Sequence, residues 1–161
     1  QVATNSMFVG KTKYTVPAAE LQKVLLGIPE GKYYWRVRGL REIDGAVVKG
    51  PWSAVWIFKV DRTAPAAPVL ARPKDGAVKE SVPAFAWYAA SGAKFYIFDY
   101  RPAGGTEADW VSSAPLSVLS YQPLDMKEGV YEWRVRALDK AGNQSQSLIR
   151  TFTLELPWPI S

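Results

Sequence analysis

The segment EGKYYWRVRGL at residues 30–40 is repeated as EGVYEWRVRAL at residues 128–138, 98 positions further along the chain. The two copies realign downstream at FKV (residues 58–60) and FTL (residues 152–154), where the offset is 94. A repeat of this length is too long for a solenoid unit and matches the roughly 100 residues of one β-sandwich domain. The chain is therefore expected to hold two related modules.

The expected boundary lies in the segment DRTAPAAP at residues 61–68. Its two prolines fix φ and remove backbone donors, which favours an extended, semi-rigid connector. We therefore predict a first module over residues 1–61, a second over residues 62–156 and a short tail over residues 157–161.

Both copies carry the alternation of β-strands. Around Trp35 and Trp133 the apolar side chains occupy every second position, so these positions are expected to face a core. The intervening side chains are expected to point to solvent, namely Arg36, Arg38, Arg134 and Arg136. Residues 17–26 have a helix-like composition, but their counterpart at residues 115–122 does not, so we expect a strand and a turn in both. The prediction is an all-β chain.

These residues resemble the fibronectin type III superfamily and its bacterial immunoglobulin-like relatives. The turn IPEGKY at residues 28–33 is similar to the entry into the family's strand F, where a tyrosine hydroxyl donates to backbone a few residues upstream. The resemblance assigns this tyrosine corner to Tyr33 and Tyr131, strand B to residues 85–87 and strand C to residues 94–100. It implies tandem fibronectin type III-like β-sandwiches of an extracellular or cell-surface protein.

The first copy is expected to be incomplete. The offset of 98 places Gln1 opposite Asp99, so residues 63–98, which hold strands A and B, have no counterpart in it. We expect this loss to leave Tyr33, Trp35 and Val37 partly exposed. Either the polypeptide is a fragment of a longer protein, which we favour, or another chain supplies the strands by β-strand addition.

Composition excludes most catalytic chemistry. The chain has no cysteine and no histidine, and therefore no thiol nucleophile, no disulfide and no imidazole base or metal ligand. Its aspartates lie mostly beside glycine or proline in turns, and DKAGN at residues 139–143 is only a fragment of a calcium loop. We therefore expect no enzyme activity, no catalytic residue, no cofactor and no metal.

The charge is mildly basic. Twenty Lys and Arg against fifteen Asp and Glu give +5 without any block of five basic residues, which favours a solubilising surface over a nucleic-acid interface. The strand arginines are expected to pair with carboxylates or to cover aromatic rings, with contact to an anionic glycan as the alternative. No apolar run approaches the roughly 20 residues that span a bilayer, so we expect no membrane insertion.

Tryptophans supply the candidate contacts. We expect Trp52, Trp110 and Trp158 to meet a ligand or a neighbouring module, whereas Trp35, Trp87 and Trp133 belong to cores. The resulting hypothesis is a structural or adhesive module of a bacterial surface or extracellular protein, acting as a spacer or assembly subunit through contacts with other protein modules or subunits. The alternative is a carbohydrate-binding accessory region of a secreted polysaccharide-active enzyme, with polysaccharide as the partner.

Overall fold

The computed structural model describes residues 1–157, and these residues confirm the all-β prediction. They fall into two compact units, Gln1–Arg62 (unit 1) and Thr63–Ser161 (unit 2), which divide one residue after the expected boundary. The helical element of the described residues is the 3-10 turn η1 (Glu107–Asp109). No helix among residues 1–157 is long and apolar enough to cross a membrane.

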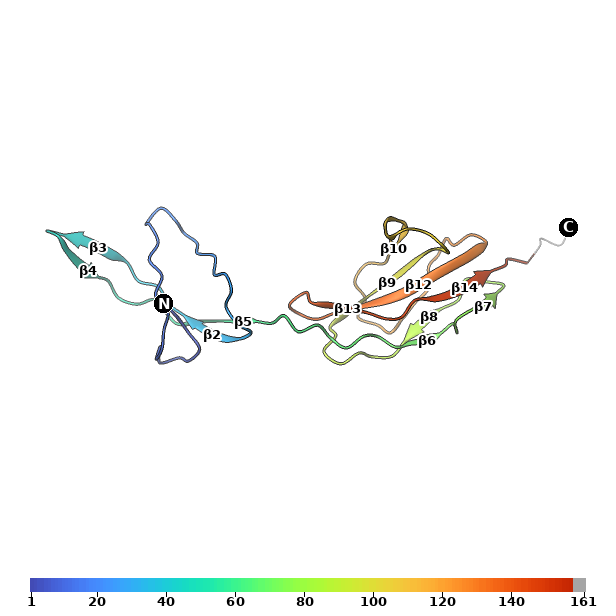
Figure 1. The fold of residues 1–161 in the computed structure, drawn as a ribbon, viewed down its shortest axis with the longest axis horizontal. Helices are drawn as coiled ribbons and strands as arrows, with labels where there is room; N and C mark the ends of the chain where they lie inside the picture. The colour runs from blue at the N-terminus through green and yellow to red at the C-terminus, as the bar shows by residue number, and fades with distance from the viewer. Residues whose placement is uncertain (158–161) are drawn as a thin grey trace. The chain divides into compact units, whose positions relative to one another are not determined.

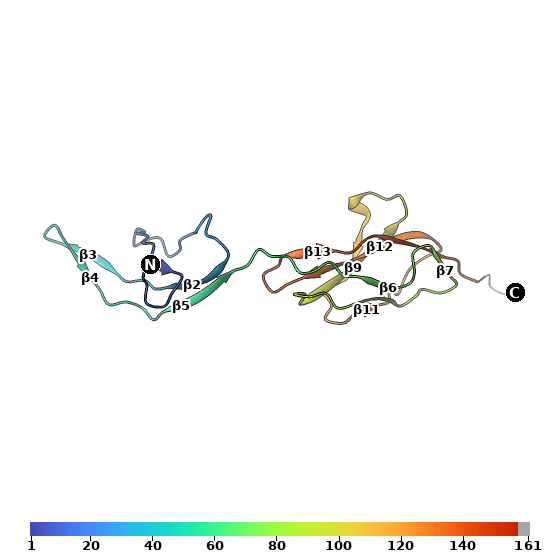
Figure 2. The same cartoon turned by 60° about the horizontal axis from the view of Figure 1, so that its bottom comes forward.

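Unit 2 is built from two sheets (Figures 1 and 2). The larger sheet has the order β10-β9-β12-β14-β7, with β13 also paired to β12; the strands are β7 (Ala77–Lys79), β9 (Phe95–Pro102), β10 (Val111–Ser112), β12 (Gly129–Leu138), β13 (Gln144–Gln146) and β14 (Arg150–Leu154). The smaller sheet has the order β11-β8-β6, with strands β6 (Leu70–Arg72), β8 (Phe85–Trp87) and β11 (Ser120–Tyr121). All pairings are antiparallel except that of β7 with β14.

Aromatic side chains from both sheets form the core of unit 2. The fully buried Phe85 ring on β8 lies 4.5 Å from Phe98, 4.9 Å from Trp133 and 5.1 Å from Phe152, measured between ring centroids. These partners stand on β9, β12 and β14, at the positions that the alternation assigns to the inner face. The smaller sheet therefore covers the apolar face of the larger one.

Unit 1 contains one sheet and one separate hairpin. The sheet has the order β1-β2-β5, from β1 (Val2–Ala3), β2 (Gly31–Trp35) and β5 (Trp56–Val60). The hairpin pairs β3 (Leu40–Ile43) with β4 (Ala46–Lys49) through Asp44 and Gly45, whose φ values of 51° and 74° are those of a type I′ turn. Asp-Gly between apolar residues is a typical signal of such a hairpin.

The sheet of unit 1 repeats the register of unit 2. Val2 pairs with Trp35 as Tyr100 pairs with Trp133, and the offset is 98 for both residues. Tyr33 pairs with Phe58 and stacks on its ring at 5.3 Å and 16°; the corresponding Tyr131–Phe152 values are 5.5 Å and 19°. The sequence repeat is thus also a repeat of strand pairing.

The inner faces of the two sheets differ in their cover. In unit 2, Trp133 and Val135 are completely buried, whereas in unit 1 Trp35 is half-buried and Val37 is 55% exposed. The described residues of unit 1 form no second sheet over this face. The expectation that Tyr33 is partly exposed was wrong, because its ring is buried against Phe58.

The expectation for residues 17–26 was also wrong in part, because they contain a turn but no strand. In unit 2 the counterpart, residues 115–122, contains β11, which is a strand because Ser120 and Tyr121 pair with β8. Unit 1 has no strand equivalent to β8 among its described residues, so this segment has no ladder to join.

The uncovered face predicts faster local opening in unit 1. Backbone amides of β2 are expected to exchange with solvent about tenfold or more faster than the matched amides of β12, since less apolar surface is buried around them. Native-state hydrogen exchange on the whole chain, comparing Tyr33–Trp35 with Tyr131–Trp133, measures the difference directly. Equal protection of the two strands would contradict the uncovered face.

Candidate functional site

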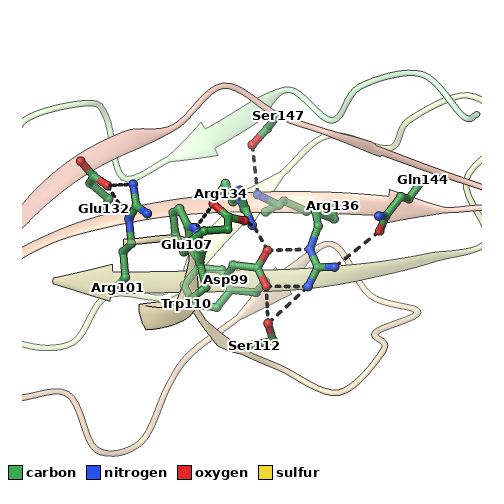
Figure 3. A network of polar contacts seen from close by, with 12 residues as sticks. Asp99, Arg101, Glu107, Trp110, Ser112, Glu132, Arg134, Arg136, Gln144 and Ser147 are labelled. Carbon is green, nitrogen blue, oxygen red and sulfur yellow. Dashed lines mark hydrogen bonds and ion pairs between the residues drawn. The ribbon is translucent and has the colours of Figure 1, made fainter. Parts of the chain in front are cut away.

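A closed cluster of charges lies on the outer face of the larger sheet of unit 2 (Figure 3). Asp99 on β9 is completely buried and lies across from Arg134 of β12 in the strand register. Its carboxylate accepts hydrogen bonds from Arg136 at 2.7 and 2.9 Å, from Arg134 at 3.1 Å and from the Ser112 hydroxyl at 2.6 Å. One carboxylate thus joins three adjacent strands.

The surroundings of Asp99 fix its ionised state. Burial alone would raise the pKa of the carboxyl, but hydrogen bonds from Arg136, Ser112 and Arg134 outweigh that effect, and the pKa of Asp99 lies below its ordinary value. The hydrogen bond to Asp99 in turn raises the pKa of Arg136. A carboxylate held by two arginines is a poor proton acceptor, so the cluster serves cohesion rather than acid–base chemistry.

Trp110 extends the cluster along the sheet. The guanidinium groups of Arg101 and Arg134 lie 4.4 and 4.2 Å from its ring centroid, and its Nε1 donates to Glu107 at 3.1 Å. Arg101 also pairs with Glu132 at 2.7 Å, and Arg134 with Glu107 at 2.9 Å. Every arginine of the cluster therefore has a carboxylate partner.

Unit 1 has arginines at the matching positions, but these arginines have different partners. The guanidinium groups of Arg36 and Arg38 both lie 4.2 Å from the ring centroid of Trp52, and Arg36 also lies 4.1 Å from that of the buried Phe8. Where unit 2 has Asp99, unit 1 has Gln1, whose Oε1 accepts from Arg36 at 3.0 and 3.3 Å. Both units therefore have arginines beside a tryptophan ring, but the hydrogen-bond acceptor in unit 1 is neutral.

The two candidate tryptophans within the described residues are thus covered by cations. Trp52 belongs to unit 1 and Trp110 to unit 2, and each is half-buried. Two guanidinium groups lie within 4.4 Å of each ring centroid, so a sugar that stacks on either ring competes with an arginine. Trp158 lies outside the described residues.

The prediction that the strand arginines point to solvent was wrong for Arg134, which is 8% exposed. Alternation places it on the outer face, but the register then sets it against Asp99, and the Trp110 ring covers it. Sequence reasoning missed Asp99 and Gln1 as acceptors. An aspartate within the apolar strand at residues 95–100, beside a strand that carries Arg-x-Arg, was the available signal.

The remaining predicted residues have structural surroundings. The Tyr33 hydroxyl donates to the Pro29 carbonyl and the Tyr131 hydroxyl to the Lys127 carbonyl, both at 2.9 Å. The Asp139 carboxylate accepts from the backbone N–H groups of Ala141 and Asn143, as in an ordinary turn. Within residues 1–157 no group of three or more acidic side chains is placed to hold a metal ion.

No protein-family model matches the sequence, and none of the curated proteins compared with it is significantly similar. Among solved structures, the chain is similar to the FN1-FN3 domains of chicken CNTN1, with a TM-score of 0.51 and 16% identity over 83% of this chain and 46% of that one. The chain has a fibronectin type III-like fold. It spans less than half of the CNTN1 chain that it matches.

Two further fibronectin type III-like structures are similar to the chain at lower TM-scores. A Fn3-like protein from Clostridium thermocellum is 22% identical, with a TM-score of 0.43, and covers 62% of this chain and 100% of its own. The fibronectin type-III domain of human fibronectin type III domain containing protein 3 is 19% identical, with a TM-score of 0.42, and covers 62% of this chain and 92% of its own.

Replacing Asp99 with Asn tests the charge cluster. At neutral pH the variant should lose about 3–5 kcal/mol of unfolding free energy, because Arg134 and Arg136 would be left without their buried counter-charge. Since the pKa of Asp99 is lowered by folding, its contribution is complete above the unfolded value of about 3.9 and is lost as the pH falls through the folded value. Urea unfolding at a series of pH values should show the two proteins converging in acid.

The exposed Asp125, replaced with Asn, is the control, and its effect should stay within about 0.5 kcal/mol. A loss for Asp99→Asn that matches this control, or a gap from the wild type that persists unchanged into acid, would contradict the structural role of the carboxylate.

Proposed function

We propose that the chain is a non-catalytic structural or adhesive module of a bacterial surface or extracellular protein, acting as a spacer or assembly subunit through contacts with other proteins. The observation that carries the proposal is the repeat of the same sheet in both units. In both, a serine hydroxyl accepts from a backbone N–H at the matching position: Ser53 from Val37 and Ser147 from Val135, each at 3.0 Å. Polar groups used in this way support a load-carrying scaffold.

The uncovered inner face of unit 1 supports assembly through protein contacts. Trp35 is half-buried, and Trp56, which pairs with it across the strands, is 62% exposed. In unit 2 the corresponding face is covered by β6, β8 and β11, with Phe85 and Trp87 pointing inward from β8. We propose that an extended segment with the same apolar alternation covers unit 1, supplied by the same protein or by its neighbour.

The alternative, a carbohydrate-binding accessory region, has less support. Neutral sugars are recognised by aromatic rings that stack on the sugar, and cations lie over both Trp52 and Trp110. A module of this kind would have to displace an arginine before it could bind.

Surface labelling of intact cells that produce the native protein tests the proposal. A membrane-impermeant, amine-reactive cross-linker should modify exposed lysines such as Lys74 and Lys127 and recover the chain joined to other protein. A cytosolic protein of the same cells is the control and should stay unmodified. Modification only after lysis, or recovery without any cross-linked partner, would refute the proposed role.

A further inference from the structure

The net positive charge of the protein comes from unit 1. Residues 1–62 hold ten Lys and Arg against five Asp and Glu, whereas the remaining residues hold ten of each. The whole excess of +5 therefore belongs to unit 1, and unit 2 is neutral. An excess concentrated in one small unit attracts anions more strongly than the same charge spread over the chain.

The excess coincides with a missing carboxylate. Arg134 and Arg136 hold Asp99 between them, while the matching Arg36 and Arg38 have only the neutral Gln1 at that position. Among residues 1–157, no carboxylate lies within ion-pair distance of Arg36 or Arg38. The arginine pair that binds an acid in unit 2 is thus retained in unit 1 without its acid.

Positions next to this arginine pair carry lysines in unit 1. Val2 bridges to Thr12 as Tyr100 pairs with Val111, so the next residue along is Lys13 in unit 1 where unit 2 has Ser112. Ser112 donates to Asp99, whereas a lysine at that position brings a further positive charge. Lys32 lies on β2 and Arg36 directly follows the last residue of that strand, so the alternation of side chains places both on the same side.

We propose that the surface of unit 1 formed by Arg36 and Arg38, which follow β2, and by Trp52 binds carboxylate side chains of an acidic segment of a partner protein. This proposal rests on the protein-contact role proposed above and names the chemistry of the contact. In unit 2 the matching arginines already bind a carboxylate, that of Asp99. In unit 1 the Gln1 amide stands at that place, so the carboxylates of the segment approach the arginine pair from the solvent side. Both guanidinium groups pack against the Trp52 ring, so they are preorganised before the acid arrives.

A protein acid fits this face better than the other polyanions. Single-stranded nucleic acid binds through bases stacked on aromatic faces, and sugars use the same faces, but those of Trp52 are occupied by the two arginines. The carboxylate seen between the matching arginines is a protein side chain. Because exposed ion pairs are individually weak, the contact should need several acids in a row and should weaken with salt.

Binding of a fluorescent peptide of alternating Asp and Ser tests the site, since alternation places its carboxylates on one face of an extended strand. The full chain should bind this peptide at low salt and should not bind the neutral peptide of alternating Asn and Ser. The double variant Arg36→Gln with Arg38→Gln should bind the peptide with an affinity lower by about tenfold or more. The control variant Lys127→Gln with Lys140→Gln removes the same net charge from exposed side chains of unit 2 and should bind as the wild type does.

Gln1→Asp keeps the test independent of any folding defect in the arginine variant. It adds the acid found in unit 2, removes no cation, and should reduce binding of the peptide by occupying the arginine pair from within. Equal weakening by the lysine control, or undiminished binding by Gln1→Asp, would overturn the site. Binding of polygalacturonate in place of the peptide would overturn the assignment to a protein partner, and neither result depends on the cell-surface labelling.

Discussion

Each main sheet has an apolar inner face, and keeping that face out of water is the largest favourable term available to a β-sandwich. In unit 2 the requirement is met by Phe85 and Trp87 of β8, which close over Phe98, Trp133 and Phe152. The strand register and the tyrosine hydrogen bond do not depend on this cover, because unit 1 has both. In unit 1 the same strand register exists, but Val37 remains exposed because the described residues supply no covering sheet.

The main sheets of the two units share their strand pairing, but the outer faces of these sheets differ in charge. In unit 2 the acids Asp99, Glu107 and Glu132 neutralise the arginines and hold the strands together. In unit 1 the same arginine positions surround an aromatic ring and a neutral amide. Several differences, among them Gln1 for Asp99, Lys13 for Ser112 and Tyr34 for Glu132, separate a closed structural cluster from a basic surface. Repeated modules can diverge in binding in this way while their strand pairing stays the same.

Sequence alternation predicted the class of fold and the inward tryptophans, because these depend on period; the tyrosine corner at Tyr33 and Tyr131 was assigned by the family resemblance. It did not predict the Asp99 cluster, since alternation says which face a side chain occupies but not which residue lies across from it. Arg134 was therefore placed in solvent, although the register buries it. Residues 17–26 were expected to contain a strand for a related reason: strand formation depends on a partner that no local pattern reveals.

The central claim is that unit 1 has the framework of unit 2 without its cover. To test this, a second copy of residues 63–98 is placed before Gln1, joined to it as Phe98 is joined to Asp99, and the chain is unfolded in urea. The NMR signal of the Trp35 indole N–H reports the unfolding midpoint of unit 1. The midpoint for unit 1 should rise toward that of unit 2, and replacing both Phe85 and Trp87 of the added copy with Ser should abolish the rise. An unchanged midpoint would contradict the claim.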